Sequence, residues 1–343
     1  MAIKKFSDTN KNSKKISQNI TSNENISKDE EIQEISLRPS YFDDYIWQSA
    51  IKEKLKIFIE AAKQRWESLQ HLLFYWAPWL WKTSISNVIA KEMWANIKIM
   101  SWPAITKAGD LAAILTSIKK WDILFIDEIH RMKTNIEEVL YSAMEDFKID
   151  IVMWKWPWAR SMRLDIPRFT LIWATTKAWS LSAPLRDRFW IIEKLDFYND
   201  LEMQEIISRS AKILWVKIDE KSLEKIAQCS RFTPRIANRL LKSLRDFAQV
   251  KNENFLDFKT TISWLNSLWV DETWLDKNDE FFLRTILEKF DWWPVWLNTL
   301  AIAMNEDKET IEDIHEPFLI QKWYIQRTQK WRILTKKALD FLS

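Results

Sequence analysis

The sequence predicts an α/β domain with a parallel β-sheet, followed by a helical lid-like domain and a small winged-helix module. Three observations lead to this prediction. Short apolar runs alternate with helical patterns up to about residue 199, the strand-like runs end there, and the last part of the chain combines three short helical patterns with a hairpin. Uninterrupted apolar runs are typical of strands buried on both faces, so the sheet should carry its chemistry at the carboxyl ends of parallel strands.

The N-terminal elements follow in order. Residues 1–35 are rich in Lys, Asn, Ser and Glu without an amphipathic period, which predicts a disordered extension. The α/β domain is expected over 36–199. Its helical patterns cover 51–64 and 83–93, and its apolar runs cover 71–75, 123–126 and 169–172.

Two further domains complete the prediction. The helical domain is expected over 200–271, because apolar residues recur with helical spacing in 201–214, 221–229 and 234–250. The winged-helix module is expected over 272–343, where Tyr324-Ile-Gln-Arg-Thr and Arg332-Ile-Leu-Thr form the hairpin.

Tryptophan and glycine occur in unusual numbers. The 343 residues include 23 Trp and 1 Gly, and the two together make up about 7% of the chain, the usual share of Gly alone. Trp292 and Trp293 precede Pro294, a turn context that normally requires Gly. Some bacterial lineages read UGA codons as glycine and others read them as tryptophan, so decoding with the wrong code would place Trp in Gly positions. We therefore expect Gly at most Trp positions.

Composition excludes several classes of protein. The net charge is only +3, so any nucleic-acid contact must come from a local basic patch. Cys229 is the only cysteine, which excludes an internal disulfide or a Cys-based zinc site and fits a reducing cytoplasm. No run of 18 apolar residues occurs, so we expect a cytoplasmic protein without a membrane span.

The segment Trp76-Ala-Pro-Trp79-Leu-Trp81-Lys82-Thr83 becomes G-A-P-G-L-G-K-T on the glycine reading. This is a P-loop between a strand and a helix. Its backbone N–H groups would hold the phosphates of ATP, Lys82 would reach the β- and γ-phosphates, and the Thr83 hydroxyl would bind Mg²⁺. Indoles at 79 and 81 would fill the space that the phosphates need, so the chain with literal Trp should bind no nucleotide.

Two later segments supply groups for hydrolysis. Asp127 and Glu128 end an apolar run 45 residues after Lys82, where Asp127 fits a Mg²⁺ contact and Glu128 a base that orients water. Thr176 ends the next run, beside the expected γ-phosphate. Arg186 and Arg188 lie at the rim of the domain, and either could be supplied to a neighbouring subunit.

The chain resembles the RuvB family of AAA+ ATPases over about residues 36–343. The resemblance rests on these segments: Leu37-Arg-Pro39, Leu124-Phe-Ile-Asp-Glu-Ile-His130, Ala143-Met-Glu-Asp-Phe147, Ala174-Thr-Thr176, Pro184-Leu-Arg-Asp-Arg-Phe189, Thr233-Pro-Arg-Ile-Ala-Asn-Arg239 and Glu316-Pro-Phe-Leu-Ile-Gln321. It implies a hexameric ring that encircles duplex DNA and pumps it through a Holliday junction held by RuvA. The resemblance places this branch migration in recombination and DNA repair, with RuvC as the partner that resolves the junction.

The resemblance also implies residue roles. Lys82 is the P-loop lysine, Asp127 and Glu128 are the Walker B carboxylates, Thr176 is sensor 1, Arg188 is the trans-acting arginine finger in preference to Arg186, and Arg235 is sensor 2. The further nucleotide contacts would be Leu37, Arg38, Trp79, Thr83, Ser84, Glu145, Asp146, Phe147 and Tyr198.

Two other surfaces follow from the chain. Residues 149–153 and 161–166 alternate like a hairpin, which the resemblance implies docks on RuvA, although they could also be an ordinary strand pair. Arg327 and Arg332, beside Lys322 and Lys330, would contact DNA phosphates without sequence preference. Two alternatives stay open: another AAA+ remodeller such as a clamp loader or an unfoldase, and, if the Trp residues are literal, a nucleotide-free DNA-binding or scaffold protein.

Overall fold

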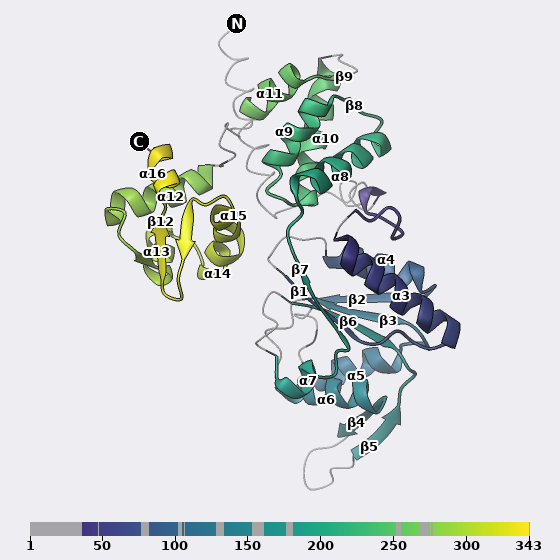
Figure 1. The fold of residues 1–343 in the computed structure, drawn as a ribbon. Helices are drawn as coiled ribbons and strands as arrows, with labels where there is room; N and C mark the ends of the chain where they lie inside the picture. The colour runs from purple at the N-terminus through teal and green to yellow at the C-terminus, as the bar shows by residue number, and fades with distance from the viewer. Residues whose placement is uncertain are drawn as a thin grey trace, which may run out of the picture. The chain divides into compact units, whose positions relative to one another are not determined.

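The computed structural model describes residues 36–342 except 47, 77–81, 102–104, 106, 128–133, 153–160, 176–180, 252–254, 268–274 and 276. The chain divides into two compact units. One spans Arg38–Phe197, and the other spans Tyr198–Ser343 together with Leu37. Figure 1 shows a sheet covered by helices in the first unit, and helices with a small separate sheet in the second.

A five-stranded parallel sheet forms the centre of the first unit, as the apolar runs predict. Its order is β2-β3-β6-β1-β7. The strands are β1 (Leu72–Trp76), β2 (Ile97–Ser101), β3 (Ile123–Asp127), β6 (Thr170–Thr175) and β7 (Ile191–Leu195). The sequence prediction missed β2 and β7. Both are edge strands, and β7 exposes the middle of its Ile-Ile-Glu-Lys-Leu segment, so neither is an uninterrupted apolar run.

Helices cover both faces of this sheet. The helices α3 (Ser49–Arg65) and α4 (Lys82–Glu92) lie on one face, and α5 (Ala108–Thr116) and α6 (Thr134–Glu145) on the other (Figure 1). The core between the sheet and the second pair contains fully buried residues of β3, β6, α5 and α6, among them Leu124, Leu171, Leu115 and Leu140. Burial on both faces explains why the central strands are apolar throughout.

A two-stranded antiparallel hairpin follows α6. Its strands are β4 (Lys148–Val152) and β5 (Ser161–Asp165). Arg163 pairs with Asp150 across the strands, with Nε 3.0 Å from Oδ1. The predicted strand pairing is therefore present, while its docking on RuvA stays a prediction.

The second unit begins with helices whose ends carry the expected caps. The helices are α8 (Asp200–Ile213), α9 (Glu220–Cys229), α10 (Pro234–Val250) and α11 (Phe258–Ser267). Asn199 accepts a hydrogen bond from the Glu202 amide at the start of α8, and Asp219 does the same for Ser222 at α9. The prediction that strands end at about residue 199 is incomplete, because this unit contains two short strands, β8 (Lys217–Ile218) and β9 (Phe255–Leu256), which pair in parallel.

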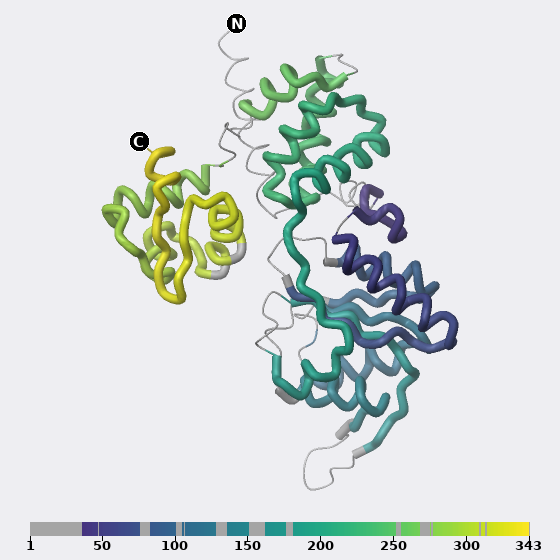
Figure 2. Tube along the Cα trace, viewed as in Figure 1, coloured from purple at the N-terminus to yellow at the C-terminus, as the bar shows by residue number. Residues whose placement is uncertain are grey.

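The C-terminal part, which runs from light green to yellow in Figure 2, has the winged-helix arrangement. Its three-stranded sheet has the order β10-β12-β11. Its strands are β10 (Val295–Trp296), β11 (Ile325–Arg327) and β12 (Trp331–Leu334). Its helical segments are α12 (Lys277–Phe290), α13 (Leu297–Met304), α14 (Lys308–Thr310), η4 (Ile311–His315), α15 (Glu316–Gln321) and α16 (Lys336–Leu342). The predicted hairpin is β11–β12, which pairs antiparallel.

The backbone at several tryptophans has a conformation that favours glycine. Twelve non-glycine residues in the described part of the chain have positive φ, and six of them are Trp: Trp66, Trp94, Trp121, Trp215, Trp292 and Trp323. Trp66 is the left-handed C-cap of α3, where its N–H reaches the carbonyls of Ala62 and Lys63. Glycine is the usual residue at such positions, because a Cβ in this region costs about 1–2 kcal/mol.

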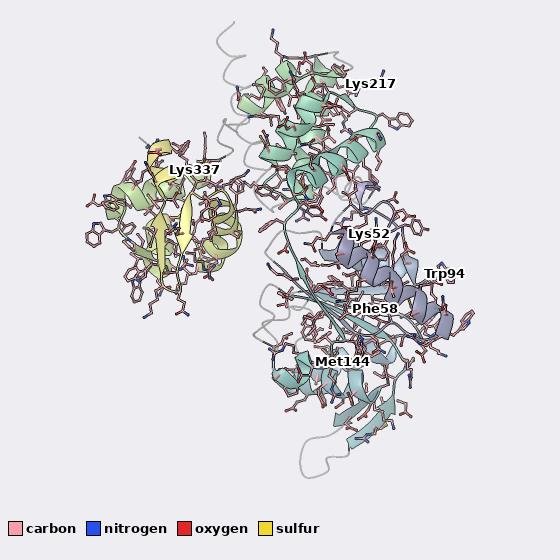
Figure 3. The ribbon with its side chains drawn as sticks, in the orientation of Figure 1. Lys52, Phe58, Trp94, Met144, Lys217 and Lys337 are labelled. Atoms are coloured by element: carbon pink, nitrogen blue, oxygen red, sulfur yellow. The ribbon has the colours of Figure 1, made fainter. Side chains whose placement is uncertain are left out.

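The side chains of the tryptophans give a second indication. Trp94 (Figure 3) is 83% exposed and Trp215 is 93% exposed. Trp121 and Trp173 bury indole N–H groups that have no hydrogen-bond partner among the described residues. An unsatisfied buried donor costs about 1–3 kcal/mol. By contrast, Gly109 lies within α5 with no atom within 4 Å of an added Cβ, so the chain's only glycine is not sterically required there.

Candidate nucleotide site

The carboxyl edge of the parallel sheet brings together the ends of three strands. Asp127, the last residue of β3, pairs in register with Ala174 of β6, which in turn pairs with Phe74 of β1. These three residues therefore form one row across the sheet. Two residues after Phe74 the strand β1 ends, and α4 begins at Lys82. The backbone thus places the Asp127 carboxylate and the amino end of α4 at the same edge of the sheet.

Several predicted residues at this edge lie outside the described part of the chain. Trp79, Glu128 and Thr176 are among them, and of Lys82 only the backbone is described. Thr83 and Ser84 lie in the first turn of α4, where Ser84 is 1% exposed and Asn87 donates a hydrogen bond to the Thr83 carbonyl at 2.7 Å. The amino end of a helix favours phosphate through its free N–H groups and its dipole.

The donors at this edge fit a magnesium ion. Thr83 offers a hydroxyl and Asp127 a half-buried carboxylate, and both are the hard oxygen ligands that Mg²⁺ prefers. In the described segments, no three His, Cys, Asp or Glu residues group as an all-protein metal site. An ion held by two protein oxygens and by phosphates fits this donor set better than an ion held by the protein alone.

A second polar cluster lies at the opposite, amino edge of the sheet. Arg188 follows the short helix α7 (Ala183–Arg186) and precedes β7. Its Nη1 forms an ion pair with Glu145, and its Nη2 donates a hydrogen bond to the Tyr141 hydroxyl. The hydrogen bond from Arg188 to Tyr141 is the main cause that raises the pKa of the arginine, with a further contribution from Glu145. The cluster therefore holds a charged guanidinium, 33% exposed, at the rim of the domain.

His71 joins this cluster to the amino end of β1. The backbone N–H groups of Trp190 and Ile191 donate to the His71 carbonyl. The Leu171 amide donates to His71 Nδ1 at 2.9 Å, so the proton lies on Nε2, which is 3.4 Å from the carbonyl oxygen of Met144. Burial lowers the pKa of His71 to about 4, and the ring is therefore neutral near pH 7.

Two more predicted nucleotide contacts follow Glu145 at the amino edge. Asp146 is exposed. Phe147 has a φ of 52° and packs edge-on against Phe169, with ring centroids 6.2 Å apart. A strand of five residues spans roughly 13 Å. The expected nucleotide residues of this unit therefore form two groups on opposite edges of one sheet, and a single nucleotide at the carboxyl edge cannot contact both.

The remaining predicted contacts are divided between the units. Arg38 is half-buried at the start of the first unit. In the second unit, the carbonyl of the buried Leu37 accepts a hydrogen bond from Arg209 Nη1 at 2.9 Å. Tyr198 is 3% exposed, and Arg235 lies half-buried in the first turn of α10.

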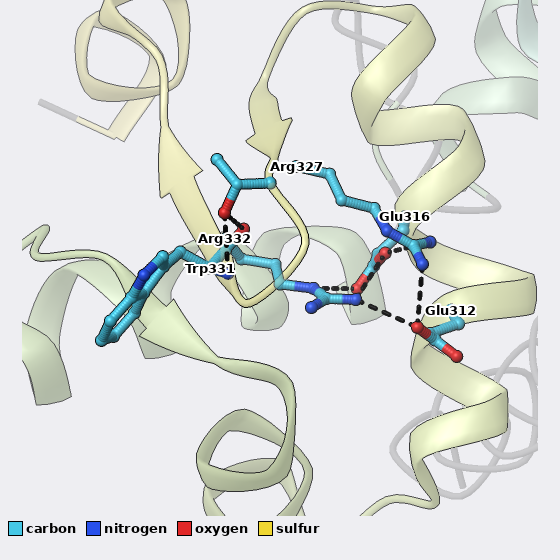
Figure 4. Close-up of polar contacts among 6 residues, drawn as sticks. Glu312, Glu316, Arg327, Trp331 and Arg332 are labelled. Atoms are coloured by element: carbon cyan, nitrogen blue, oxygen red, sulfur yellow. Dashed lines mark hydrogen bonds and ion pairs between the residues drawn. The ribbon is translucent and has the colours of Figure 1, made fainter.

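The two arginines predicted to contact DNA are both engaged by carboxylates. Arg327 and Arg332 are register partners on β11 and β12. Arg332 Nε donates to Glu316 Oε1 at 2.6 Å, and Arg327 Nη1 donates to Glu316 Oε2 at 3.0 Å (Figure 4). Both arginines also reach Glu312.

Their exposure separates the two arginines. The Arg332 side chain is 3% exposed and that of Arg327 is 45% exposed. Glu316 is fully buried, so it requires a paired cation. The prediction that Arg332 presents its guanidinium to a phosphate disagrees with this geometry, because Arg332 neutralises a buried carboxylate instead. Sequence alone does not distinguish the two arginines, because they are register partners on one face of the hairpin and differ only in how deeply each is buried against Glu316.

Sequence reasoning missed Tyr141 and gave His71 no role. Neither belongs to a short motif. The only signal for Tyr141 was its position four residues before Glu145 on a helix, which places both side chains on one face.

Comparison with known proteins covers almost the whole globular part of the chain. The family model of the Holliday junction DNA helicase RuvB P-loop domain matches residues 37–195, the RuvB AAA lid domain matches 198–271, and the RuvB C-terminal winged helix domain matches 272–343. The Holliday junction branch migration complex subunit RuvB of Staphylococcus saprophyticus is 51% identical over 310 residues, which cover 90% of this chain and 93% of that protein.

Solved structures agree with these matches. A mutant of Thermotoga maritima RuvB aligns with a TM-score of 0.83 and 43% identity, covering 89% of this chain and 98% of that one. The Thermotoga maritima RuvB Holliday junction branch migration motor aligns with a TM-score of 0.81 and 42% identity, covering 90% and 98%. With its P-loop domain, lid and winged helix, the chain belongs to the RuvB family of AAA+ ATPases.

Proposed function

We propose that this protein is the ATP-driven motor that moves the branch point of a Holliday junction in recombination and DNA repair. The match of all three domains to RuvB carries the proposal, and the division of the predicted nucleotide residues between the two edges of one sheet supports a ring. Such a domain completes its nucleotide site only when the carboxyl edge of one copy meets the amino edge of another. A closed ring, which in this proposal is a hexamer around duplex DNA, meets this requirement at every interface.

Each group has a distinct role in the proposed hydrolysis. Lys82 and Thr83 hold the phosphates of ATP, and Mg²⁺ bound by Thr83 and Asp127 offsets the charge that develops on them. Glu128 orients the attacking water, and Thr176 senses the γ-phosphate. Arg188 of the neighbouring copy stabilises the transferring phosphoryl group, and Arg235 couples its loss to the lid. The remaining nucleotide contacts are Leu37, Arg38, the glycine at 79, Ser84, Glu145, Asp146, Phe147 and Tyr198.

The proposal requires glycine at 76, 79 and 81. Six tryptophans outside the P-loop have a left-handed backbone, which favours glycine at those six positions. If the chain carries Trp in place of Gly at these positions, the same replacement is expected at the three Trp positions of the P-loop. The codons decide this directly: UGA at 76, 79 and 81 supports glycine, and UGG requires literal tryptophan. Mass spectrometry of the native protein is the independent measurement.

We propose that the β11–β12 hairpin, the wing of the second unit, contacts DNA and that the β4–β5 hairpin of the first unit contacts RuvA. In the wing, the partly exposed Arg327 and the exposed Lys330 would contact the DNA backbone, and β4–β5 would dock on RuvA in the cytoplasm. We expect Arg327→Ala to weaken DNA binding and to reduce the salt slope of log K by about 1. Arg332→Ala should instead destabilise the module by up to about 3 kcal/mol, because it leaves the buried Glu316 carboxylate with only the partly exposed Arg327 as a cationic partner. Fluorescence anisotropy at several salt concentrations and thermal unfolding separate the two effects.

Stimulated ATP turnover tests the function itself. The glycine form should hydrolyse ATP faster with a four-way junction and RuvA than alone, and should move the branch point. Unfolded protein should not stimulate it, whereas an unfoldase would respond, and a primed template with a clamp would stimulate a clamp loader. The match to RuvB models of all three domains supports the branch-migration motor over these alternatives. A junction without effect on turnover or branch position would contradict the proposal.

A further inference from the structure

The guanidinium of Arg188 is held by two side chains of α6. Tyr141 and Glu145 are four residues apart, so they lie on one face of the helix. Tyr141 makes two contacts with the arginine. Its hydroxyl accepts from Nη2, and its ring centroid lies 4.8 Å from Cζ, within cation–π range. Glu145 adds the ion pair to Nη1.

The backbone that carries Arg188 is fixed separately. Leu185 and Phe189, on either side of it, are 1% and 4% exposed. The Arg188 amide donates to the Leu185 carbonyl, and the Phe189 amide donates to the Arg186 carbonyl. The carboxyl end of α6 is also fixed, because His71 contacts the Met144 carbonyl. The torsions of the Arg188 side chain therefore remain to be set, and the contacts that set them come from α6.

We propose that Tyr141 is a positioning residue for the arginine that this subunit supplies to its neighbour's nucleotide. The inference rests on the proposed trans action of Arg188. A guanidinium has five N–H donors, of which Tyr141 and Glu145 occupy two. The arginine can therefore keep both contacts to α6 while other donors face a phosphate. Positioning before the subunits meet removes an ordering cost from the hydrolytic step.

The expected kinetic effect lies in kcat. In the glycine form, Tyr141→Ala should lower kcat for ATP about 30-fold, because the ring and the hydroxyl are both lost. Tyr141→Phe keeps the ring and should lower kcat only about 3-fold. The KM for ATP should change less than about 2-fold in both variants, since Tyr141 lies far from the carboxyl edge of its own subunit. Arg65→Ala removes a comparable exposed ion pair, with Glu67, and serves as the control.

Mixed rings distinguish positioning in trans from structural damage. Lys82→Ala subunits lack a working P-loop but present an intact Arg188 and Tyr141. Mixed with Tyr141→Ala subunits, they should restore turnover well above the sum of the two separate preparations. Thermal unfolding should show that Tyr141→Ala subunits stay folded, and Tyr141→Phe keeps the test available if they do not.

The outcomes separate this inference from the proposed function. Failure of Lys82→Ala subunits to rescue Arg188→Ala subunits would contradict trans action itself. Rescue of Arg188→Ala together with wild-type kcat in both Tyr141 variants would overturn only the role of Tyr141. A Tyr141→Ala defect that appears in KM, or that intact neighbours do not rescue, would also overturn it.

Discussion

The two edges of the parallel sheet hold the residues that we propose to be functional in different ways. At the carboxyl edge the backbone places them: Asp127 ends a buried strand and Thr83 lies in the first turn of a helix. At the amino edge, side chains far apart in the sequence hold Arg188, which is 47 residues from Tyr141. Residues placed by the ends of strands and helices can be recognised from short sequence motifs. Residues held by side-chain contacts between distant segments can be recognised only in the folded structure.

The largest expected effect is at the carboxyl edge. In the glycine form, Lys82→Ala or Asp127→Asn should lower ATP turnover by about 10³-fold or more, because the phosphates lose a cation or Mg²⁺ loses a ligand. Phosphate release is the measurement. Lys91→Ala, in the last turn of the same helix, should leave turnover near the wild-type value. Near-normal turnover in either site variant would mean that this edge does not hold the nucleotide.

The amino edge should show an effect of similar kind that is specific to one arginine. Arg188→Ala should lower kcat by about 10³-fold with little change in KM, because it removes charge stabilisation in the transition state. Arg186→Ala, two residues earlier at the end of α7, should lower kcat less than about 10-fold. Steady-state kinetics at saturating DNA separates them. Equal losses of kcat in the two variants would contradict the assignment of the trans-acting role to Arg188, the arginine that Tyr141 and Glu145 hold.

Acid should weaken the amino edge through His71. Its pKa is lowered to about 4 in the folded protein from the ordinary 6.5, so between these values the unfolded chain binds a proton that the folded chain does not. This contribution to stability is complete above pH 6.5 and is lost as the pH falls toward 4, by about 3 kcal/mol in total. Urea unfolding of the parent and of His71→Gln between pH 7.5 and 4.5 checks it. Parallel pH profiles of the two proteins would contradict it.

The smallest expected effect concerns backbone conformation. Trp94→Gly should raise the free energy of unfolding by about 1 kcal/mol, because it relieves a φ of 53° at a side chain that is 83% exposed. The lost contact with Lys63 offsets about 0.5 kcal/mol of the relief. Trp190→Gly, 74% exposed and without positive φ, should lower stability by about 0.5–1 kcal/mol. Urea unfolding of both variants should therefore show changes of opposite sign. A lower stability of Trp94→Gly would argue against glycine as the natural residue at 94.

The sequence predicted the elements that are apolar throughout or periodic along a helix. The central strands β1, β3 and β6, the helices α3, α4 and α8 to α10, and the hairpin β11–β12 all lie where local patterns predict them. The edge strands β2 and β7 were missed, because one neighbouring strand and a partly exposed face leave a mixed pattern. The prediction that Arg332 contacts DNA disagrees with the structure, because the sequence pattern of a basic hairpin residue is the same whether its side chain faces solvent or pairs with a buried carboxylate.

The α/β order, the predicted P-loop and Walker B segments, and the conflict between Trp and the turns that need Gly all follow from residues close together along the chain, so they can be inferred from the sequence alone. The tertiary structure decided which edge of the sheet each polar group occupies, that Tyr141 and Glu145 hold Arg188, and that Glu316 claims Arg332. The physical reason is that ion pairs, burial and cation–π contacts depend on distance in space, and residues 47 apart in sequence meet only when the sheet and its helices have packed.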